Sequence, residues 1–174
     1  MTKNNKKGFT IIEVVLVLAI AGLIFLMVFI ALPALQRSQR NTRRRQDMAR
    51  ILSAFNDYQA NNNGKMPEDS GDLANLGKRY LTGNGTAIPT KNGETCVSDQ
   101  FCDPDGTSYW FGDAFDEKDV DLTSATAMDH RIYYAQNATC NSGTEGDMAP
   151  GNGDREIAIM YILEGNAIYC GDNQ

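Results

Sequence analysis

Four cysteines offer redox chemistry, and all of them lie in the second half of the chain, at Cys96, Cys102, Cys140 and Cys170. An even number of cysteines downstream of an apolar run is typical of disulfides formed in an oxidising compartment. Four cysteines allow three connectivities, of which we favour the neighbour pairs Cys96–Cys102 and Cys140–Cys170; reduced, buried thiols are the alternative. No two of them have the short spacing of a structural zinc site.

Clustered carboxylates could hold a hard cation. Seven aspartates fall within 23 residues, at Asp99, Asp103, Asp105, Asp113, Asp116, Asp119 and Asp121. Oxygen ligands on a turn-like loop are what calcium requires, which makes Asp99, Asp103 and Asp105 a calcium candidate. The simpler interpretation is a solvated acidic loop, and we expect no bound metal.

Catalytic signatures are missing from the sequence. It has no P-loop, no G-x-S-x-G and no dinucleotide fingerprint, and its single histidine is His130, next to Asp129. We expect His130 to be a surface residue and not a base. The protein is therefore not expected to be an enzyme or to use a cofactor.

One carboxylate, Glu13, stands at the head of a long apolar segment. Val14 to Leu32 is a run of 19 residues without a charged or polar side chain, long enough to span a membrane. A charge in hydrocarbon costs about 2.5–3.5 kcal/mol at the centre of a span and less near its end, so Glu13 implies a functional reason. The run is too long for a secretory signal peptide and no small-residue cleavage site follows it, so we expect the span to persist.

The residues Lys7-Gly8-Phe9-Thr10-Ile11-Ile12-Glu13, followed by the apolar run, resemble the class III signal of type IV pilins and related pseudopilins. The resemblance covers the chain from Met1 to about residue 65. It implies that a prepilin peptidase cuts between Gly8 and Phe9 and methylates the Phe9 amine. It also implies that Glu13 neutralises the N-terminal amine of an adjacent subunit during assembly.

Charge is distributed unevenly along the chain. The overall charge is −6, but residues 1–50 carry +7 and residues 51–174 carry −13. The acidic part should not bind nucleic acid through its field. We expect the run Arg43-Arg44-Arg45 to lie beside the acidic heads of neighbouring subunits; DNA capture is the alternative.

The arginines after the span outnumber the lysines before it, so the positive-inside rule alone would leave the C-terminal part in the cytoplasm. The signal and the cysteines favour the opposite orientation, which we adopt.

One long helix, predicted from Phe9 to Asn63, would position these residues. Pro33 removes one backbone hydrogen bond and is expected to bend the helix and not to end it. Gln36 to Asp47 has no apolar side chain, and such a helix is stable only where it bridges packed parts. Apolar residues then recur at three- and four-residue spacing from Met48 to Tyr58, and Gly64 suits the helix end.

The remainder is predicted to be a small head domain of class α+β. A helical turn is expected at 73–81, a strand or core anchor at 109–111, and strands at 131–135, 156–163 and 167–170. The last two strands would be joined by the two-residue turn Gly165-Asn166. Loops are expected at 82–106, tied by Cys96–Cys102, and at 143–154. The predicted fold is that of type IV pilins: the long N-terminal helix packed on a three-stranded antiparallel meander, with loops tied by disulfides.

The domain organisation that follows has four parts: a prepilin leader at 1–8, a transmembrane and filament-core helix at 9–33, its continuation at 34–63, and a globular head at 64–174. The resemblance implies a subunit of a type IV pilus that is cleaved, N-methylated and polymerised with its own copies for adhesion or motility. Its partners would be the prepilin peptidase, an inner-membrane assembly platform and, before assembly, the membrane, but no nucleic acid.

The precursor would be a single-pass inner-membrane protein with its C-terminal domain outside, and the assembled form an extracellular pilus. Two alternatives stay open. One is a pseudopilin or minor pilin of a type II secretion or DNA-uptake system. The other is a membrane-anchored binding module that never polymerises.

Overall fold

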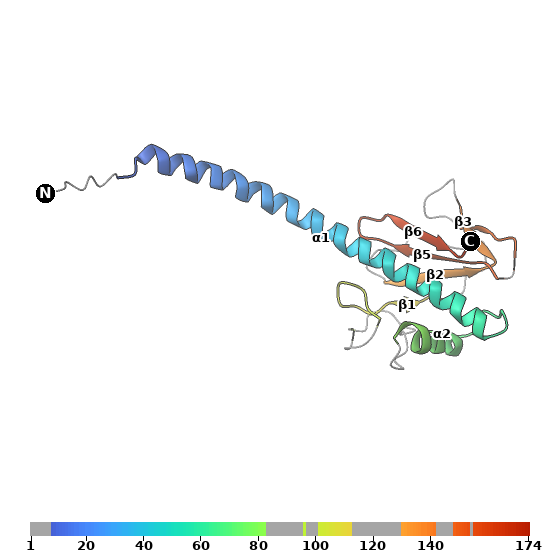
Figure 1. The fold of residues 1–174 in the computed structure, drawn as a ribbon. Helices are drawn as coiled ribbons and strands as arrows, with labels where there is room; N and C mark the ends of the chain where they lie inside the picture. Colours follow the sequence, from blue (N-terminus) through green and yellow to red (C-terminus); the bar gives the residue numbers. More distant parts are fainter. Residues whose placement is uncertain (1–7, 83–95, 97–100, 113–129, 142–147, 154) are drawn as a thin grey trace. The chain divides into compact units, whose positions relative to one another are not determined.

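The computed structural model describes residues 8–82, 96, 101–112, 130–141, 148–153 and 155–174 (Figure 1). The chain divides into two units, one ending at Gln39 and the other running from Arg40 to Gln174. The described part of the first unit is the leading half of helix α1. The second unit holds the rest of α1 and all of the β-structure.

Helix α1 spans Ile11–Asn61 and continues through Pro33 without a break, as predicted. By its length and composition it is apolar enough to cross a membrane. It ends two residues before the predicted end because Asn63 and Gly64 both adopt left-handed backbone conformations, with φ of 57° and 81°. The Gly64 N–H donates to the Gln59 carbonyl at 2.8 Å and satisfies one of the last carbonyls of the helix.

The second half of α1 buries one stripe of side chains. Arg44, Met48, Ile51, Phe55 and Tyr58 are all buried and recur at alternating intervals of four and three residues. The stripe begins with an arginine inside the segment that lacks apolar side chains. The polar stretch of α1 is therefore a packed element and not a free linker.

The main sheet has four strands in the order β1-β2-β5-β6. Their bounds are Trp110–Phe111, Arg131–Gln136, Ile157–Ile162 and Ile168–Asp172. The antiparallel pairs β2–β5 and β5–β6 form the predicted meander. Strand β1 lies within the segment 109–111, which was expected to be a strand or a core anchor, and it adds a parallel edge next to β2. The parallel pairing was not predicted, because two residues carry no periodicity.

Two local predictions were wrong. The segment 143–154 was expected to be a loop, but Met148–Pro150 forms β4 and pairs with β3, Ala138–Cys140. The turn after β5 has three residues, Glu164 to Asn166, and not two. Leu163 closes it at both ends, by accepting from the Asn166 N–H and by donating to the Ala167 carbonyl.

The core lies between α1 and one face of the sheet. The Phe55 ring packs against the rings of Phe111 and Tyr134, with centroids 5.9 and 5.6 Å apart. Helix α2, Ser70–Leu76, and the following π-helical turn Gly77–Leu81 pack beside the end of α1 and add leucines to this core (Figure 1). The predicted α+β class, a long N-terminal helix on a small sheet with two disulfides, is confirmed.

Candidate functional site

Reciprocal hydrogen bonds between Thr10 and Glu13 close the first turn of α1. The Thr10 N–H and hydroxyl both donate to Glu13 Oε2, at 3.0 and 2.9 Å, and the Glu13 N–H donates to Thr10 Oγ1 at 3.3 Å. Since α1 begins at Ile11, Thr10 is the N-cap and Glu13 the third helical residue, which is the arrangement of a capping box. This local role was not predicted, although the T-x-x-E spacing is visible in the sequence.

The capping box leaves one carboxylate oxygen of Glu13 unoccupied. Both Thr10 donors go to Oε2, and Oε1 has no hydrogen-bond partner among the described residues. Gly8 and Phe9 precede the helix and are exposed, Phe9 at 89%. The predicted processing and assembly residues thus lie together at one end of α1, with an accessible Gly8–Phe9 peptide bond and a carboxylate oxygen able to accept from a cation.

The apolar part of α1 is exposed in the single chain. Large hydrophobic side chains from Phe9 to Leu35 face outward, including Met27 at 75% and Phe29 at 71%. A continuous apolar surface of this size is covered by lipid or by other protein in a native setting, because its exposure to water is unfavourable.

A second polar site lies where α1 meets the head. Arg44 is only 1% exposed. Its Nε and Nη2 donate to Oδ2 and Oδ1 of Asp103, at 2.6 and 2.7 Å, and its Nη1 donates to Glu164 Oε1 at 2.7 Å. The pairing with Asp103 is bidentate, the geometry in which a guanidinium and a carboxylate interact most strongly.

Asp103 is buried and fully hydrogen-bonded. Besides Arg44 it accepts from the Tyr161 hydroxyl on Oδ2 and from the Asp105 N–H on Oδ1, both at 3.0 Å. These four donors match the four lone-pair positions of a carboxylate. Burial alone would raise the pKa of Asp103, but the neighbouring His130 and the hydrogen bonds from Arg44 hold that pKa well below its usual range. The expectation of a solvated acidic loop is therefore wrong for Asp103.

Glu164, in the turn between β5 and β6, joins the same cluster. Arg40 donates to both of its carboxylate oxygens, at 2.6 and 2.7 Å, and these bonds lower the pKa of Glu164 to about 2. The Asn41 side chain donates to the Glu164 carbonyl at 3.1 Å and accepts from the Glu164 N–H at 3.0 Å. The N–H and carbonyl of Glu164 are thus hydrogen-bonded to the Asn41 side chain of α1 and not to a neighbouring strand, so Glu164 belongs to the turn.

His130 is buried in the cluster, at 6% exposure, so its prediction as a surface residue was wrong. Its Nε2 lies 3.2 Å from Asp105 Oδ2, and its Nδ1 lies 3.7 Å from Asp103 Oδ2 and 3.4 Å from the Tyr161 hydroxyl. The Asp103 carboxylate raises the pKa of His130 above its usual 6.5, against the lowering effect of burial. With His130 protonated, three cations face three carboxylates here, and the cluster is electrically neutral.

The calcium candidate overlaps this cluster. Ligand atoms of Asp103, Asp105 and His130 lie within 4.8 Å of one another. However, Arg44 already supplies the positive charge, with Nη2 3.6 Å from Asp105 Oδ2, and the lone pairs of Asp103 are taken. A cation would have to displace the guanidinium. Asp99, the third candidate ligand, lies outside the described residues.

The arginine run divides between two environments. Arg44 was expected to face neighbouring subunits, but its partners are inside its own fold. Arg43 and Arg45 are exposed, and neither makes an ion pair or hydrogen bond with any residue that the structure describes. The 3.6-residue helical repeat separates them, because it turns only the middle arginine of the three toward the sheet.

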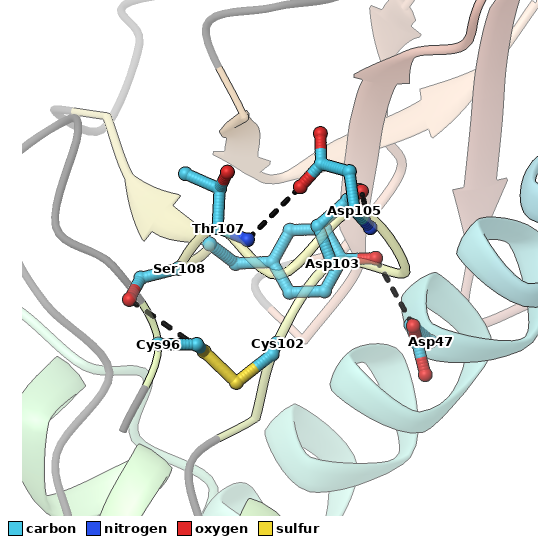
Figure 2. Close-up of a disulfide and its surroundings, with 8 residues drawn as sticks. Asp47, Cys96, Cys102, Asp103, Asp105, Thr107 and Ser108 are labelled. Atoms are coloured by element: carbon cyan, nitrogen blue, oxygen red, sulfur yellow. Dashed lines mark hydrogen bonds between the residues drawn. A yellow bond between two sulfur atoms is a disulfide. The ribbon is translucent and has the colours of Figure 1, made fainter. Parts of the chain in front are cut away.

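The cysteines form the neighbour pairs Cys96–Cys102 and Cys140–Cys170, with Cα atoms 6.1 and 5.8 Å apart. Figure 2 shows the first disulfide next to Ser108, whose hydroxyl donates to the Cys96 sulfur at 3.7 Å, beside the turn that carries Asp103. Cys102 directly precedes Asp103 in the sequence, but the sequence did not reveal that this aspartate is buried. The second disulfide ties β3 to β6.

Comparison with known families identifies the beginning of the chain. Residues 3–29 match the family model described as the prokaryotic N-terminal methylation motif. No curated protein and no solved structure matches the chain. The matched segment contains the Gly8–Phe9 bond, the capping box and most of the exposed apolar part of α1.

Proposed function

We propose that this chain, which carries the class III signal of type IV pilins and pseudopilins, is a structural subunit of a type IV pilus. The methylation motif at residues 3–29 is the observation that carries the proposal. It heads a helix whose first half is apolar and exposed and whose second half packs on a disulfide-bonded sheet domain. A filament subunit needs such a combination of a processed N-terminus, an apolar rod and a folded head.

In this proposal, processing changes the charge at the head of the rod. Cleavage between Gly8 and Phe9 creates an amine on Phe9, which the prepilin peptidase then methylates. The free Oε1 of Glu13 accepts a hydrogen bond from the Phe9 amine of an adjacent subunit, while Oε2 keeps its hydrogen bonds from Thr10. Pairing offsets the cost of placing a carboxylate in an apolar environment, which is severe for an isolated charge.

During assembly, the apolar part of α1 exchanges its contacts with lipid for contacts with other subunits. The precursor is a single-pass inner-membrane protein with its head outside, and residues 9–33 leave the bilayer to pack against the same residues of other copies on an assembly platform. Between helices in lipid, van der Waals packing and hydrogen bonding drive association. The assembled form is an extracellular filament with the head domains on its surface.

The intact mass of the protein, purified after expression of the full sequence, tests whether the leader is removed and Phe9 is methylated. A chain that starts at methylated Phe9 supports the proposal. A chain that still starts at Met1 refutes it and favours the membrane-anchored module that never polymerises.

Two substitutions of Glu13 separate its charge from its capping role. Glu13→Ala removes both, and is expected to leave membrane insertion intact and to lower the filament yield by roughly tenfold, as for the loss of one charged pair. Glu13→Gln keeps the capping geometry without the charge. If sheared-filament yield is normal in the Gln variant, the amine pairing is wrong.

The same motif is shared with pseudopilins, so a short secretion or DNA-uptake filament is the second candidate. Subunit abundance and filament length discriminate the two. Long surface filaments built mainly of this chain would support the pilus, and short filaments with this chain as a minor component would support the alternative.

A further inference from the structure

The Cys96–Cys102 disulfide lies across the open end of the turn at 102–108, which we call the Asp103 turn. The two ends of this turn, Cys102 and Ser108, form an antiparallel bridge. Cys96 contacts the turn at three points. It is bonded to Cys102, its N–H donates to the Gly106 carbonyl at 3.0 Å, and its sulfur accepts from the Ser108 hydroxyl at 3.7 Å (Figure 2). The disulfide therefore joins both ends of the turn.

The geometry of the Asp103 turn sets the direction of the Asp103 carboxylate. The Asp103 N–H donates to the Thr107 carbonyl, and its own carbonyl accepts from the Gly106 N–H, both at 2.9 Å. The Asp105 N–H donates to Oδ1 of the Asp103 side chain at 3.0 Å. These bonds orient Asp103 from within the turn, and its carboxylate then accepts from the guanidinium of Arg44 on α1 at 2.6 and 2.7 Å. The disulfide, the turn and α1 are thus linked in one chain of contacts.

The pairing of Asp103 with Arg44 tolerates little displacement. Asp103 is 2% exposed and Arg44 is 1% exposed, so water offers neither side chain an alternative partner. Hydrogen bonds weaken steeply as their angle departs from linear, and a buried ion pair is stable only when its geometry is excellent. Opening a disulfide restores conformational freedom to the loop that it closes. The Asp103 turn would then adopt conformations in which this pairing is lost.

We propose that the Cys96–Cys102 disulfide is a redox switch for the contact between α1 and the head. When the disulfide is formed, the turn holds Asp103 on Arg44, and when it is reduced, this contact opens while the hydrophobic core stays folded. Both cysteines are partly exposed, within reach of a small dithiol. One thiolate of the dithiol attacks a sulfur of the disulfide and displaces the other cysteine, and the second thiolate displaces the first cysteine. Two electrons and two protons pass to the protein, and the products are two cysteine thiols and a cyclic disulfide.

The contacts around the Asp103 turn explain why its opening should stay local. Phe101 and Tyr109, on either side of the turn, are buried in the core, with ring centroids 5.3 Å apart. Glu164 binds Nη1 of Arg44 from a different turn, so reduction leaves this guanidinium one close carboxylate partner. The switch acts within one subunit, whether or not the chain polymerises. In an oxidising compartment the contact of Asp103 with α1 forms together with the disulfide.

Hydrogen exchange of the Arg44 Nε–H in the full chain, measured by NMR in detergent micelles, tests the switch. The C140S/C170S variant retains only the Cys96–Cys102 disulfide, so dithiothreitol reduces this one bond. On reduction, the Arg44 Nε–H is expected to exchange roughly tenfold faster or more, because the bond to Asp103 opens locally. The backbone amides of β5, a strand that is paired on both sides, should keep their exchange rates.

The matched variant is C96S/C102S, which keeps only the other disulfide. Without any reductant, its Arg44 Nε–H should exchange as fast as in the reduced C140S/C170S chain, and dithiothreitol should not change that rate. Slow Arg44 exchange in C96S/C102S or in the reduced C140S/C170S chain would overturn the switch. So would an equal acceleration of the β5 amides, because the disulfide would then stabilise the fold only as a whole. None of these results bears on filament formation, so the proposed function would stand in either case.

Discussion

Arg44 is a charged side chain held inside a packed interface, and its surroundings explain why it is tolerated. Taking a guanidinium out of water costs several kcal/mol, and this cost is offset only if the partners are close and the hydrogen bonds complete. Asp103 and Glu164 meet both conditions. Burial would lower the pKa of Arg44, but its hydrogen bonds to Asp103 raise it overall, so the residue stays charged.

Replacing Asp103 tests this account. Asp103→Asn leaves Arg44 buried without a bidentate anion, and should lower the free energy of unfolding by about 3 kcal/mol. Asp57→Asn is the matched control, since Asp57 is exposed and a surface change of this kind stays within about 0.5 kcal/mol. Chemical denaturation of the full chain in detergent measures both. Equal stabilities of the two variants would contradict the role of Asp103.

The capping box at the head of α1 makes a separate prediction at the residue scale. Thr10→Ala removes both hydroxyl interactions and should cost about 1 kcal/mol of helix-end stability, so the first-turn amides should exchange about fivefold faster. Thr10→Ser keeps the hydroxyl and should exchange like the wild type. The measurement is amide hydrogen exchange of the full chain in micelles. The capping assignment fails if Ala and Ser behave alike.

Helix α1 has two parts. Its exposed apolar part is followed, from Arg40 onward, by a part that packs on the head and that we call the arm. One contact between the arm and the head is at the β5–β6 turn, where Asn41 binds both backbone groups of Glu164 and Arg40 binds its carboxylate. The left-handed residues Gly165 and Asn166, with φ of 89° and 63°, give this turn the curvature that presents Glu164 to the helix. The arm thus contacts the sheet through a turn as well as through the core.

Removing the Asn41 amide should loosen this turn. Asn41→Ala loses two hydrogen bonds to Glu164 backbone groups, and is expected to destabilise the folded chain by about 2 kcal/mol. Gln46→Ala, five residues further along α1 at an exposed position, is the control and should change little. Thermal unfolding compares the two variants. If Asn41→Ala unfolds at the same temperature as the control, the two hydrogen bonds between Asn41 and Glu164 do not stabilise the fold.

At the scale of the whole molecule, the ion cluster makes stability depend on pH. The pKa of Glu164 is lowered to about 2 and that of Asp103 is also lowered, so their contribution is present above about pH 4 and is lost as the pH falls below it. The pKa of His130 is raised above 6.5, so its contribution is complete below pH 6.5 and is lost as the pH rises through the folded-state value. Maximal stability should therefore lie between these limits.

His130→Asn should remove the upper limb of this profile. Asparagine accepts the left-handed backbone conformation that His130 adopts, with φ of 48°, so the substitution changes the titration and spares the turn. The wild-type unfolding temperature should fall between pH 6 and pH 8, and that of the variant should be flatter over the same range. A parallel fall in both proteins would remove His130 as the cause.

The features that depend on local pattern could be predicted from the sequence. The apolar run and the signal at its head, the amphipathic stretch from Met48 to Tyr58, the helix end near Gly64 and the three meander strands were all predicted. Each of them is written in neighbouring residues, as a run, a period or a turn residue, and needs no knowledge of the rest of the fold. The T-x-x-E capping box belongs to this class as well, and could have been found.

Which charged side chains are buried became visible only in the folded chain. Arg44 meets Asp103 across 59 residues and Glu164 across 120, and no periodicity marks either pair. Charged residues at these positions look like any solvated run, because a charge is buried only when a distant chain segment supplies its partner. The same reason explains why the burial of His130, the parallel pairing of β1 with β2 and the pairing of β3 with β4 were not predicted. These short segments acquire a structure only from the neighbours that they pair with.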